Sequence, residues 1–373
     1  MKFFRGSVLY LAFSMNPSSG SRDLPPLESI GGTGEEVEDA QITQLLRLPG
    51  RSGLTTNIND DTEIILREFD KTAVSMYTNQ VGGHRVLMKP ENSSVILKPY
   101  DAAEYNFYER CMPLACSSLM PFTARCYGEV DLRRLDTETS SPGSPPKSDK
   151  YVMLQDLAAG RRRPSILDIK MGLKQRSIRN FSDKKLKSKE MKSLSTTSHK
   201  LGFRIGGVQL YKDGSVVFYN KYLGRIQDPA GTYEILSQFF DSLGTTSNVR
   251  RLLLLDAFID KLAELRGVIK TLKGFRFWSG SLLFIYDCSD ELSDEAVVNS
   301  ATVKMIDFAN YTILTGSETP DNEYIYGIES LLTFLKAIRQ GSLKCPVLDV
   351  LPPDVAVQDS ELAKAAKEYH NVH

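Results

Sequence analysis

The sequence predicts an α+β fold with a small strand-rich N-terminal part and a larger mixed C-terminal part. Short apolar runs of strand length recur along the chain, and longer segments with the apolar spacing of helices lie between them. A polar, proline-containing loop at residues 137–150 interrupts this pattern, and no internal repeat is present. The 373 residues, 41% hydrophobic and 25% charged, suffice for two core-bearing lobes of an ordinary globular protein.

The first 75 residues differ in composition from the rest of the chain. They are rich in Gly, Ser, Pro and acidic side chains, which predicts a largely disordered N-terminal extension. Lys2 and Arg5 precede a short apolar run at residues 8–13, as in a signal peptide, but residues 16–20 form no convincing cleavage site. No other apolar run approaches the roughly 20 residues of a membrane span. We therefore expect neither secretion nor a membrane span.

The strand-rich part is expected to begin near Val81. Apolar runs at residues 86–88 and 95–97 flank a turn-forming segment at 90–94, which predicts a β-hairpin. Residues 102–111 carry a helical pattern, and a further strand is predicted at 151–154.

The larger part is predicted to mix strands and helices. Strands are expected at residues 165–169, 203–211, 216–219, 282–286 and 303–308, and helices at 182–193, 233–243, 249–271 and 325–338. Lys212, Asp213 and Gly214 form a turn signal between two of these strands.

The formal net charge is zero, but the charges are unevenly distributed. Residues 161–200 contain 13 Lys or Arg against 3 Asp or Glu, a local excess of ten positive charges. Such a block attracts a strongly anionic partner, which could be a polyphosphate, a nucleic acid or an acidic membrane.

The five cysteines are odd in number and irregularly spaced, and no CxxC pair occurs. With only four histidines, the chain offers little for a structural zinc site. Reduced thiols in the cytosol or the nucleus are therefore expected.

Three segments contain residues suited to nucleotide chemistry. Lys98 ends an apolar strand and Glu104 follows on the next helix, so the lysine could reach nucleotide phosphates while the carboxylate holds it. Taken alone, this pair reads more readily as a surface lysine and a solvated glutamate.

The second segment spans residues 164–172. Strand alternation places Asp168 and Lys170 on one face and Leu167, Ile169 and Met171 on the other. A carboxylate and an ammonium on one face could bind ribose hydroxyls and a phosphate, or could form a solvated surface ion pair.

The third segment is Asp307, directly after an apolar strand. Carboxylates at such positions often hold Mg²⁺ against nucleotide phosphates, because Mg²⁺ needs few protein oxygens. A capping or turn aspartate is the common alternative.

Taken together, these segments resemble the inositol polyphosphate kinase family. The family hallmark PxxxDxKxG is matched by Pro164, Asp168, Lys170 and Gly172. Residues 279–283 resemble the family's SSLL element, with Gly280 replacing a serine, and residues 306–309 match its metal-binding IDFA. The resemblance runs from about residue 80 to residue 338.

Several shorter segments are most similar to the inositol hexakisphosphate kinase branch. These are residues 80–84 (QVGGH), 104–109 (EYNFYE), 207–211 (GVQLY), 220–225 (NKYLGR) and 324–327 (YIYG). The multikinase branch can carry arginine in place of Gln209.

The resemblance implies a two-lobed, protein-kinase-like α+β fold with a small antiparallel-β N-lobe and a larger mixed C-lobe. We accordingly divide the chain into an extension at residues 1–75, an N-lobe at 76–157 with the hinge at its end, a C-lobe at 158–345 and a C-terminal tail at 346–373. The C-lobe is expected to hold the inositol phosphate and Mg²⁺ sites. No GxGxxG phosphate loop is present, so the chain does not resemble an ordinary protein kinase.

The resemblance also implies roles for single residues in ATP binding. Lys98 is expected to contact the ATP phosphates, with Glu104 positioning it. Gln155 and Leu157 correspond to the hinge, whose backbone binds adenine, and Asp168 is expected to bind the ribose.

On the substrate side, Lys170 is expected to bind the inositol phosphate and to be catalytic together with Asp307, the Mg²⁺ ligand. Lys174, Lys185 and Gln209 are expected to contact the substrate.

Two departures affect the expected substrate site. The TRQHGDD that commonly follows the hallmark is replaced by residues 173–179, LKQRSIR, which are more basic and lack the histidine. A second histidine, after IDFA, is replaced by Asn310.

The predicted function is an ATP- and Mg²⁺-dependent inositol hexakisphosphate kinase, with an inositol polyphosphate as small-molecule partner. Phosphoryl transfer relies on positioning and cations, in agreement with a site that offers no obvious nucleophile. The alternatives are a multikinase acting on tris- or tetrakisphosphates and a polybasic binding module. We expect a monomer that does not bind nucleic acid and resides in the cytosol, the nucleus or both.

Overall fold

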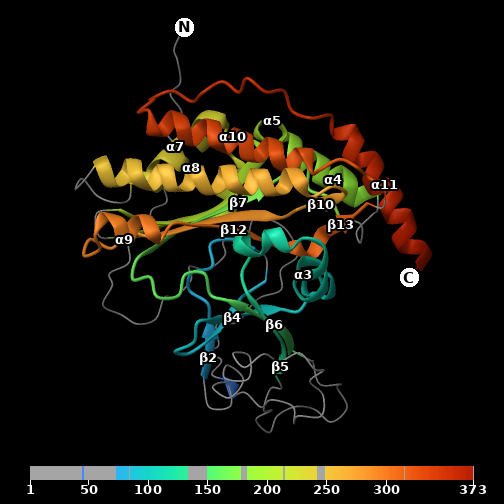
Figure 1. Ribbon diagram of the computed structural model, residues 1–373, viewed down its shortest axis with the longest axis horizontal. Helices are drawn as coiled ribbons and strands as arrows, with labels where there is room; N and C mark the ends of the chain where they lie inside the picture. The colour runs from blue at the N-terminus through green and yellow to red at the C-terminus, as the bar shows by residue number, and fades with distance from the viewer. Residues whose placement is uncertain are drawn as a thin grey trace.

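The computed structural model describes residues 44–45, 73–83, 85–132, 149–177, 183–212, 215–241, 248–314 and 316–372. Its strands and helices form two lobes, one below the other in Figure 1, with a sheet in each. Nearly all of the predicted N-terminal extension lies outside the described residues.

The N-lobe is built on a six-stranded antiparallel sheet with strand order β1-β2-β3-β4-β6-β5. Its strands are β1 (Gln44–Leu45), β2 (Ala73–Met76), β3 (Met88–Pro90), β4 (Val95–Pro99), β5 (Cys126–Leu132) and β6 (Asp149–Gln155). The predicted hairpin is confirmed, since β3 and β4 pair antiparallel. Strand β5 was not predicted because Gly128, Glu129 and Asp131 dilute its apolar pattern, and its pairing with β6 determines its conformation.

One helical stretch connects strands β4 and β5. It comprises α2 (Ala102–Asn106), a π-helical turn (Phe107–Cys111), α3 (Met112–Ala115) and a 3₁₀ turn (Ser117–Phe122). The Asp101 carboxylate caps the start by accepting hydrogen bonds from the amides of Ala103 and Glu104, at 3.1 and 3.2 Å. The cap sets where the helix begins and so places Glu104, which is buried.

The C-lobe contains a five-stranded antiparallel sheet with strand order β12-β11-β7-β8-β9. Its strands are β7 (Pro164–Met171), β8 (Phe203–Lys212), β9 (Ser215–Tyr219), β11 (Ser281–Asp287) and β12 (Thr302–Ile306), and a separate ribbon pairs β10 (Phe275–Phe277) with β13 (Tyr311–Ile313). The helices are α4 (Asp183–Leu194), α5 (Ser198–Leu201), α6 (Lys221–Arg225), α7 (Pro229–Asp241), α8 (Asn248–Thr271), α9 (Asp294–Asn299), α10 (Asn322–Arg339) and α11 (Val355–Val372). The strands and helices predicted for this part are confirmed to within a few residues.

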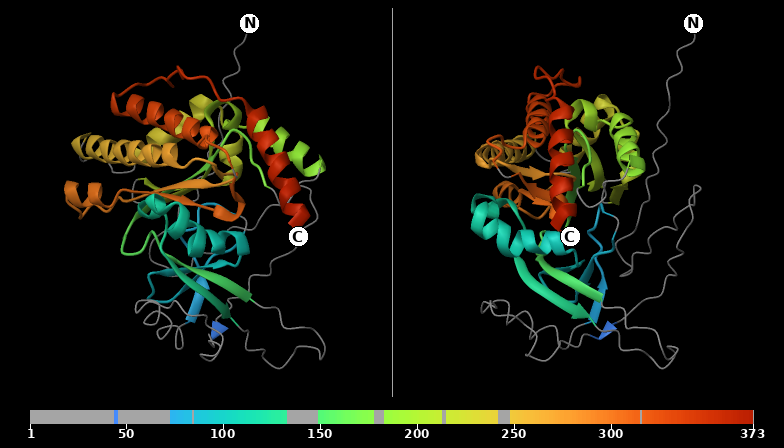
Figure 2. Two further views of the ribbon diagram at one scale, coloured as in Figure 1. Left: turned by 45° about the vertical axis from the view of Figure 1, so that its right-hand side comes forward. Right: turned by 90° about the vertical axis from the view of Figure 1, so that its right-hand side faces the viewer.

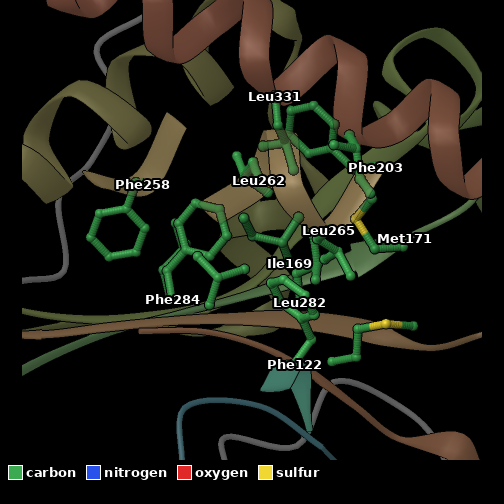
Figure 3. Packing of buried hydrophobic residues seen from close by; sticks show 14 of the residues in the cluster. Phe122, Ile169, Met171, Phe203, Phe258, Leu262, Leu265, Leu282, Phe284 and Leu331 are labelled. Carbon is green, nitrogen blue, oxygen red and sulfur yellow. The ribbon is translucent and has the colours of Figure 1, made fainter. Parts of the chain in front are cut away.

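Helices α7, α8 and α10 cover one face of the C-lobe sheet, and the N-lobe lies on the other side (Figures 1 and 2). The main core fills the layer between these helices and the sheet, where Phe258, Leu262 and Leu331 from the helices meet Ile169 and Phe284 from the strands (Figure 3). All five side chains are fully buried. Burial of this apolar area is the main stabilising term for the lobe.

Strand β7 follows the predicted alternation. Leu167, Ile169 and Met171 are buried in the core, while the side chains of Asp168 and Lys170 emerge on the opposite face. The strand therefore links the core of the C-lobe to the space between the lobes.

The segment predicted as a C-terminal tail, residues 346–373, contains helix α11 instead of being tail throughout. Leu362 and Ala366 are buried on its inner face. The helix escaped prediction because four of its nine apolar residues are alanine and large apolar residues are few, which gives a weak periodic signal. Among the helices that the structure describes, none is both long enough and apolar enough to traverse a bilayer.

Candidate active site

A cavity of about 640 Å³ lies between the lobes. Apolar side chains of both lobes line one part of it: Ile96, Leu154, Ile166, Leu283 and Ile285. Basic side chains line another part: Lys189, Lys192, Arg204, Lys221 and Arg225. Strand β7 runs along the cavity, where Ile166, Asp168 and Lys170 all line the wall. Because a strand advances about 3.3 Å per residue, about 13 Å separates Ile166 from Lys170. The strand therefore connects the apolar part with the basic part.

The register of the C-lobe sheet brings the two hallmark segments together. Ile306 at the end of β12 pairs with Ser281 of β11, which pairs with Lys170 of β7. Asp307 follows Ile306 directly, so its carboxylate lies beside the lysine although the two residues are 137 positions apart. Lys170 in turn pairs with Arg204 of β8, which places both cations on the cavity wall.

Five side chains form an ionic cluster at the middle of the cavity. The Lys98 Nζ lies 2.8 Å from Glu104 Oε1 and 2.8 Å from Asp307 Oδ1. The Lys170 Nζ lies 2.5 Å from Asp307 Oδ2 and 3.5 Å from Asp168 Oδ2. The structure thus brings together Lys98, Glu104, Asp168, Lys170 and Asp307, five of the predicted site residues.

The cluster keeps Asp307 and its two lysines charged. Burial alone would raise the pKa of Asp307, but the ammonium groups of Lys170 and Lys98 outweigh it and hold the pKa well below the usual range. Burial would lower the pKa of Lys98, and the carboxylates of Asp307 and Glu104 raise it instead. Lys170 behaves in the same way beside Asp168 and Asp307. At neutral pH the cavity therefore presents an ionised carboxylate flanked by two ammonium groups.

Asp307 adopts the left-handed backbone conformation, with φ 67° and ψ 59°, which non-glycine residues rarely occupy. The turn that follows is held from the N-lobe side. Glu104 Oε1 accepts a hydrogen bond from the amide of Phe308 at 3.1 Å, and the Phe308 ring stacks on Phe107 with centroids 3.9 Å apart. The Phe of the IDFA motif therefore anchors the strained aspartate to the helix that supplies Glu104.

Asp168 is a buried carboxylate on the cavity wall. Among the described residues, its Oδ1 has no hydrogen-bond partner. Burial raises its pKa, and Lys170 opposes that shift. A Cβ on Gly82 would come within 1.9 Å of Asp168 Oδ2, so glycine is required where the N-lobe segment crosses this carboxylate. An unpaired acceptor at this position fits a ribose hydroxyl donor.

Gln155 and Leu157 both line the cavity, as predicted for the hinge. The Gln155 side chain accepts a hydrogen bond from the amide of Arg125 at 3.3 Å, so it is directed toward the neighbouring loop. A glutamine in place of the family's glutamate is compatible with adenine contacts through the backbone. The sequence did not point to Asp156, which accepts a hydrogen bond from the Tyr77 hydroxyl at 2.5 Å and forms an ion pair with Lys89.

The basic part of the cavity is a cluster of like charges. Burial lowers the pKa of Lys192 to about 8, assisted by the nearby Arg204 and Arg225, and burial together with Arg225 lowers the pKa of Arg204 to about 10. Both shifts show cations held close together, an arrangement that an anion would relieve. Arg204 was not singled out from the sequence, although strand alternation on β8 and pairing with Lys170 would have indicated its face.

The structure does not bring Lys174 or Gln209 to the cavity wall. Lys174 Nζ lies 3.0 Å from Asp359 Oδ2 on helix α11, so this side chain points to α11, although the next residue, Gln175, lines the cavity. Gln209 is fully buried and donates through Nε2 to the carbonyl of Pro164 at 2.9 Å. The side chain of Lys185 lies outside the described residues, so its predicted role stays a prediction.

Comparison with known proteins agrees with this geometry. A family model described as inositol polyphosphate kinase matches residues 151–336. Inositol hexakisphosphate kinase 2 of Homo sapiens and that of Oryctolagus cuniculus are each 32% identical over 228 residues. Each of these matches covers 52% of this chain and 52% of the relative, so the chain matches about half the length of these curated relatives.

Among solved structures, the inositol phosphate multikinase Ipk2 of S. cerevisiae, in complex with ADP and Mn²⁺, is similar with a TM-score of 0.53 and 25% identity. The match covers 65% of this chain and 98% of that chain, which confirms the predicted fold class. The matched family segment includes both Lys170 and Asp307. On these matches and the hallmark residues gathered at the cavity, the chain belongs to the inositol polyphosphate kinase family.

Proposed function

We propose that this protein transfers the terminal phosphoryl group of ATP to an inositol polyphosphate, with inositol hexakisphosphate as the preferred acceptor. The observation that carries the proposal is the cavity itself. An apolar part beside the hinge and a basic part beside α4 are joined by the ionic cluster of Lys98, Lys170 and Asp307. A nucleotide base fits the first part and a polyanion the second, with the phosphates meeting between them.

The basic part favours an acceptor of high charge density. Lys192 and Arg204 have lowered pKa values because burial and neighbouring cations destabilise their charged forms. A ligand with several phosphates around a small ring stabilises the charged form of every cation that it contacts. Such a ligand therefore gains more from this wall than a singly phosphorylated one.

The chain's own residues can perform the transfer by positioning and charge. Lys98, held by Glu104, binds the nucleotide phosphates, and Asp168 accepts from the ribose. Lys170 stays protonated beside two carboxylates, so it stabilises negative charge on the moving phosphoryl group and does not act as a base. The phosphorus–oxygen bond to ADP breaks as a bond forms to a phosphate oxygen of the acceptor, which yields a diphosphoinositol pentakisphosphate.

Asp307 is a residue in the cavity that is suited to bind a divalent metal ion. Its carboxylate is ionised, lies on the cavity wall and is 31% exposed, and carboxylate oxygens are the ligands that Mg²⁺ takes in nucleotide sites. When bound, Mg²⁺ would neutralise charge on the nucleotide phosphates. Lys98 and Lys170 orient the carboxylate through its two oxygens.

The choice of acceptor has one rival. The relatives at 32% identity are named inositol hexakisphosphate kinases, whereas the solved structure that matches 65% of the chain is an inositol phosphate multikinase. Phosphorylation of a tris- or tetrakisphosphate is therefore the second candidate.

The test is to incubate the purified protein with Mg·ATP and, in separate reactions, inositol hexakis-, pentakis- and trisphosphate, and to separate the products by charge. A product more acidic than hexakisphosphate, absent with Asp307→Ala, is expected. Turnover of the trisphosphate alone would assign the multikinase activity. No turnover of any acceptor would overturn the proposal and favour a polybasic binding module.

The oligomeric state and the compartment are further expectations: a monomer, in the cytosol, the nucleus or both. The expected compartment follows from the cysteines, which are odd in number and irregularly spaced in the sequence. Size-exclusion chromatography with light scattering and localisation of a tagged protein would test the two expectations.

A further inference from the structure

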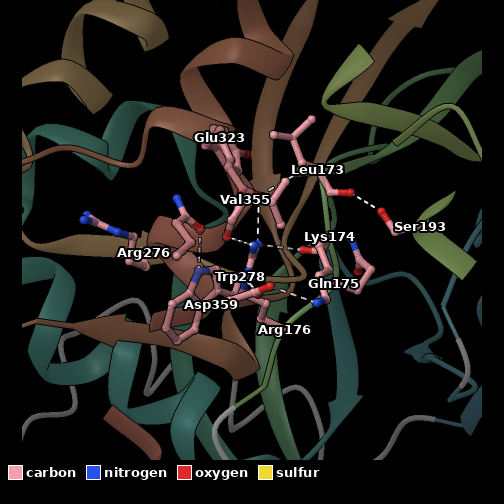
Figure 4. Close-up of polar contacts among 12 residues, drawn as sticks. Leu173, Lys174, Gln175, Arg176, Ser193, Arg276, Trp278, Glu323, Val355 and Asp359 are labelled. Atoms are coloured by element: carbon pink, nitrogen blue, oxygen red, sulfur yellow. Dashed lines mark hydrogen bonds and ion pairs between the residues drawn. The ribbon is translucent and has the colours of Figure 1, made fainter. Parts of the chain in front are cut away.

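The side chains of the loop at residues 172–177, which follows β7, point in two directions. Gln175 lines the cavity, whereas Lys174 and Arg176 on either side of it point to helix α11 (Figure 4). The loop therefore forms part of the cavity wall and is also the contact between that wall and the C-terminal helix.

Arg176 is the anchor of this contact, with no exposed surface at all. Its Nη1 lies 2.8 Å from Glu323 Oε2 of α10, and its Nε lies 2.9 Å from Asp359 Oδ1 of α11. Burial alone would lower the pKa of Arg176, but the two carboxylates raise it. A buried guanidinium with carboxylates on two separate helices holds a fixed geometry, because its planar fork of donors must meet both partners.

A second contact places α11 against the turn that precedes β11. Trp278, in this turn, donates through Nε1 to Gln358 Oε1 at 2.8 Å. Arg276 lies before the turn, in β10, and forms a two-point ion pair with Glu361 at 2.8 and 2.5 Å, which fastens α11 to that strand and to neither cavity-bordering loop. Ser279, the next residue in this turn, lines the cavity and donates to the carbonyl of Arg176 at 2.8 Å. Helix α11 thus touches both loops that border this side of the cavity.

The network continues to the basic helix. The Ser193 hydroxyl of α4 donates to the carbonyl of Leu173 (Figure 4). Lys189 and Lys192 of the same helix line the basic part of the cavity. A continuous set of contacts therefore runs from Asp359 through Arg176 and the loop to the lysines.

We propose that α11 is a clamp that holds the acceptor side of the active site, with Arg176 as a positioning residue fastened by Asp359. The helix lies beyond residues 151–336, the segment that the family model matches. Neither α11 nor Arg176 contacts the cavity directly, so the effect is on the placement of Gln175, Ser279 and the α4 lysines. The identity of the acceptor rests on the proposed function, whereas the clamp rests on the contacts alone.

The test compares two variants on the same helix. Asp359→Asn removes the charge that holds Arg176, and Glu361→Gln removes the charge that holds Arg276, which is not on the cavity wall. With Asp359→Asn, the KM for inositol hexakisphosphate is expected to rise about tenfold, the typical cost of losing a charged hydrogen bond, while the KM for ATP changes less than about twofold. Glu361→Gln should lower thermal stability similarly but leave both KM values near wild type.

Hydrogen exchange of the ligand-free protein gives a readout that needs no acceptor. Asp359→Asn should speed amide exchange in residues 172–177 about tenfold, and Glu361→Gln should not. Asp359→Glu, which restores the carboxylate, should recover both the KM and the protection. If the wild-type protein turns over no inositol phosphate, the proposed function fails. The hydrogen-exchange comparison then tests the clamp by itself. Unchanged exchange and KM in Asp359→Asn, or equal effects in the two variants, would overturn the clamp.

Discussion

Two ionic networks, one before and one at the loop that follows β7, differ in what surrounds them. In the first, Lys98, Lys170 and Asp307 border the cavity, and the Asp307 side chain is 31% exposed. In the second, Arg176 and Glu323 are 0% and 3% exposed, and Asp359, which completes the network from α11, is 37% exposed but does not line the cavity. Both consist of cations held between carboxylates.

The comparison shows that the chemistry of the groups does not by itself identify an active site. A charged group that borders a cavity can replace its protein partner with a ligand or with water. Its ion pair can therefore break when a ligand binds. Charges sealed on every side cannot, so removal of one partner leaves the other buried and uncompensated. The proposed catalytic role of the first network and the proposed positioning role of the second therefore rest on access to the cavity, not on residue type.

The largest difference between an effect on activity and an effect on stability is expected for Lys170→Met. Removal of this cation should lower kcat by about 10³-fold or more, in the range known for cations that stabilise a transferring phosphoryl group. The loss of unfolding free energy should be smaller than in the second network, because Asp307 borders the cavity and keeps Lys98 as its partner, and burial already raises the pKa of Asp168, which favours its neutral form. Product formation from Mg·ATP and urea denaturation, measured on the same preparation, check both halves. A large stability loss with normal kcat would break the comparison.

The mirror experiment is Arg176→Met in the sealed network. Glu323 would be left buried without its cation, at a cost of about 3–5 kcal/mol of unfolding free energy. Burial already raises the pKa of Glu323 and Arg176 opposes this, so the loss should grow as pH rises and the carboxyl ionises. Urea denaturation at several pH values measures the effect. A second change, Glu323→Gln, should restore part of the stability, and no restoration would contradict the ion-pair explanation.

The smallest effect concerns Lys192, whose pKa of about 8 lies within reach of ordinary assays. As pH rises through 8 the free enzyme loses this positive charge, so the KM for a polyanionic acceptor should rise, by about threefold to tenfold for one cation–phosphate contact. Stability should move in the opposite direction. The lysine is protonated in the unfolded chain up to its ordinary pKa of 10.5, so between pH 8 and 10.5 unfolding is coupled to proton uptake and stability rises with pH.

Measurement of KM and of the urea midpoint from pH 7 to 10 checks these two trends. Lys192→Met is the matched variant and should flatten both. A KM that rises equally in wild type and variant would assign the pH dependence to another group.

Much of the fold and the centre of the site followed from local patterns. The alternation in residues 164–171 predicted which side chains enter the core and which reach the opposite face, and the structure places Leu167 and Lys170 accordingly. Asp307 was recognised by its place after an apolar strand. These predictions succeeded because strand periodicity and motif order are carried by residues close together in the chain.

Other features depended on contacts between distant residues. Lys174 and Arg176 appeared in the sequence as part of a basic block, and their partner Asp359 is more than 180 positions away. Helix α11 was missed because its few large apolar residues gave little periodic signal, while its polar residues carry the docking. Gln209 was assigned to the substrate by resemblance, but packing against Pro164 holds it beneath the site.

The sequence by itself determined the fold class, the strand that carries Asp168 and Lys170, and the family to which the chain belongs. The tertiary structure alone decided which charges face the cavity and which are sealed, since both networks are built from side chains on separate strands and helices. Local sequence sets the direction of a side chain along its own strand or helix, but exposure depends on what packs over it. The division of the basic block into residues that line the cavity and residues that contact α11 therefore required the packed lobes.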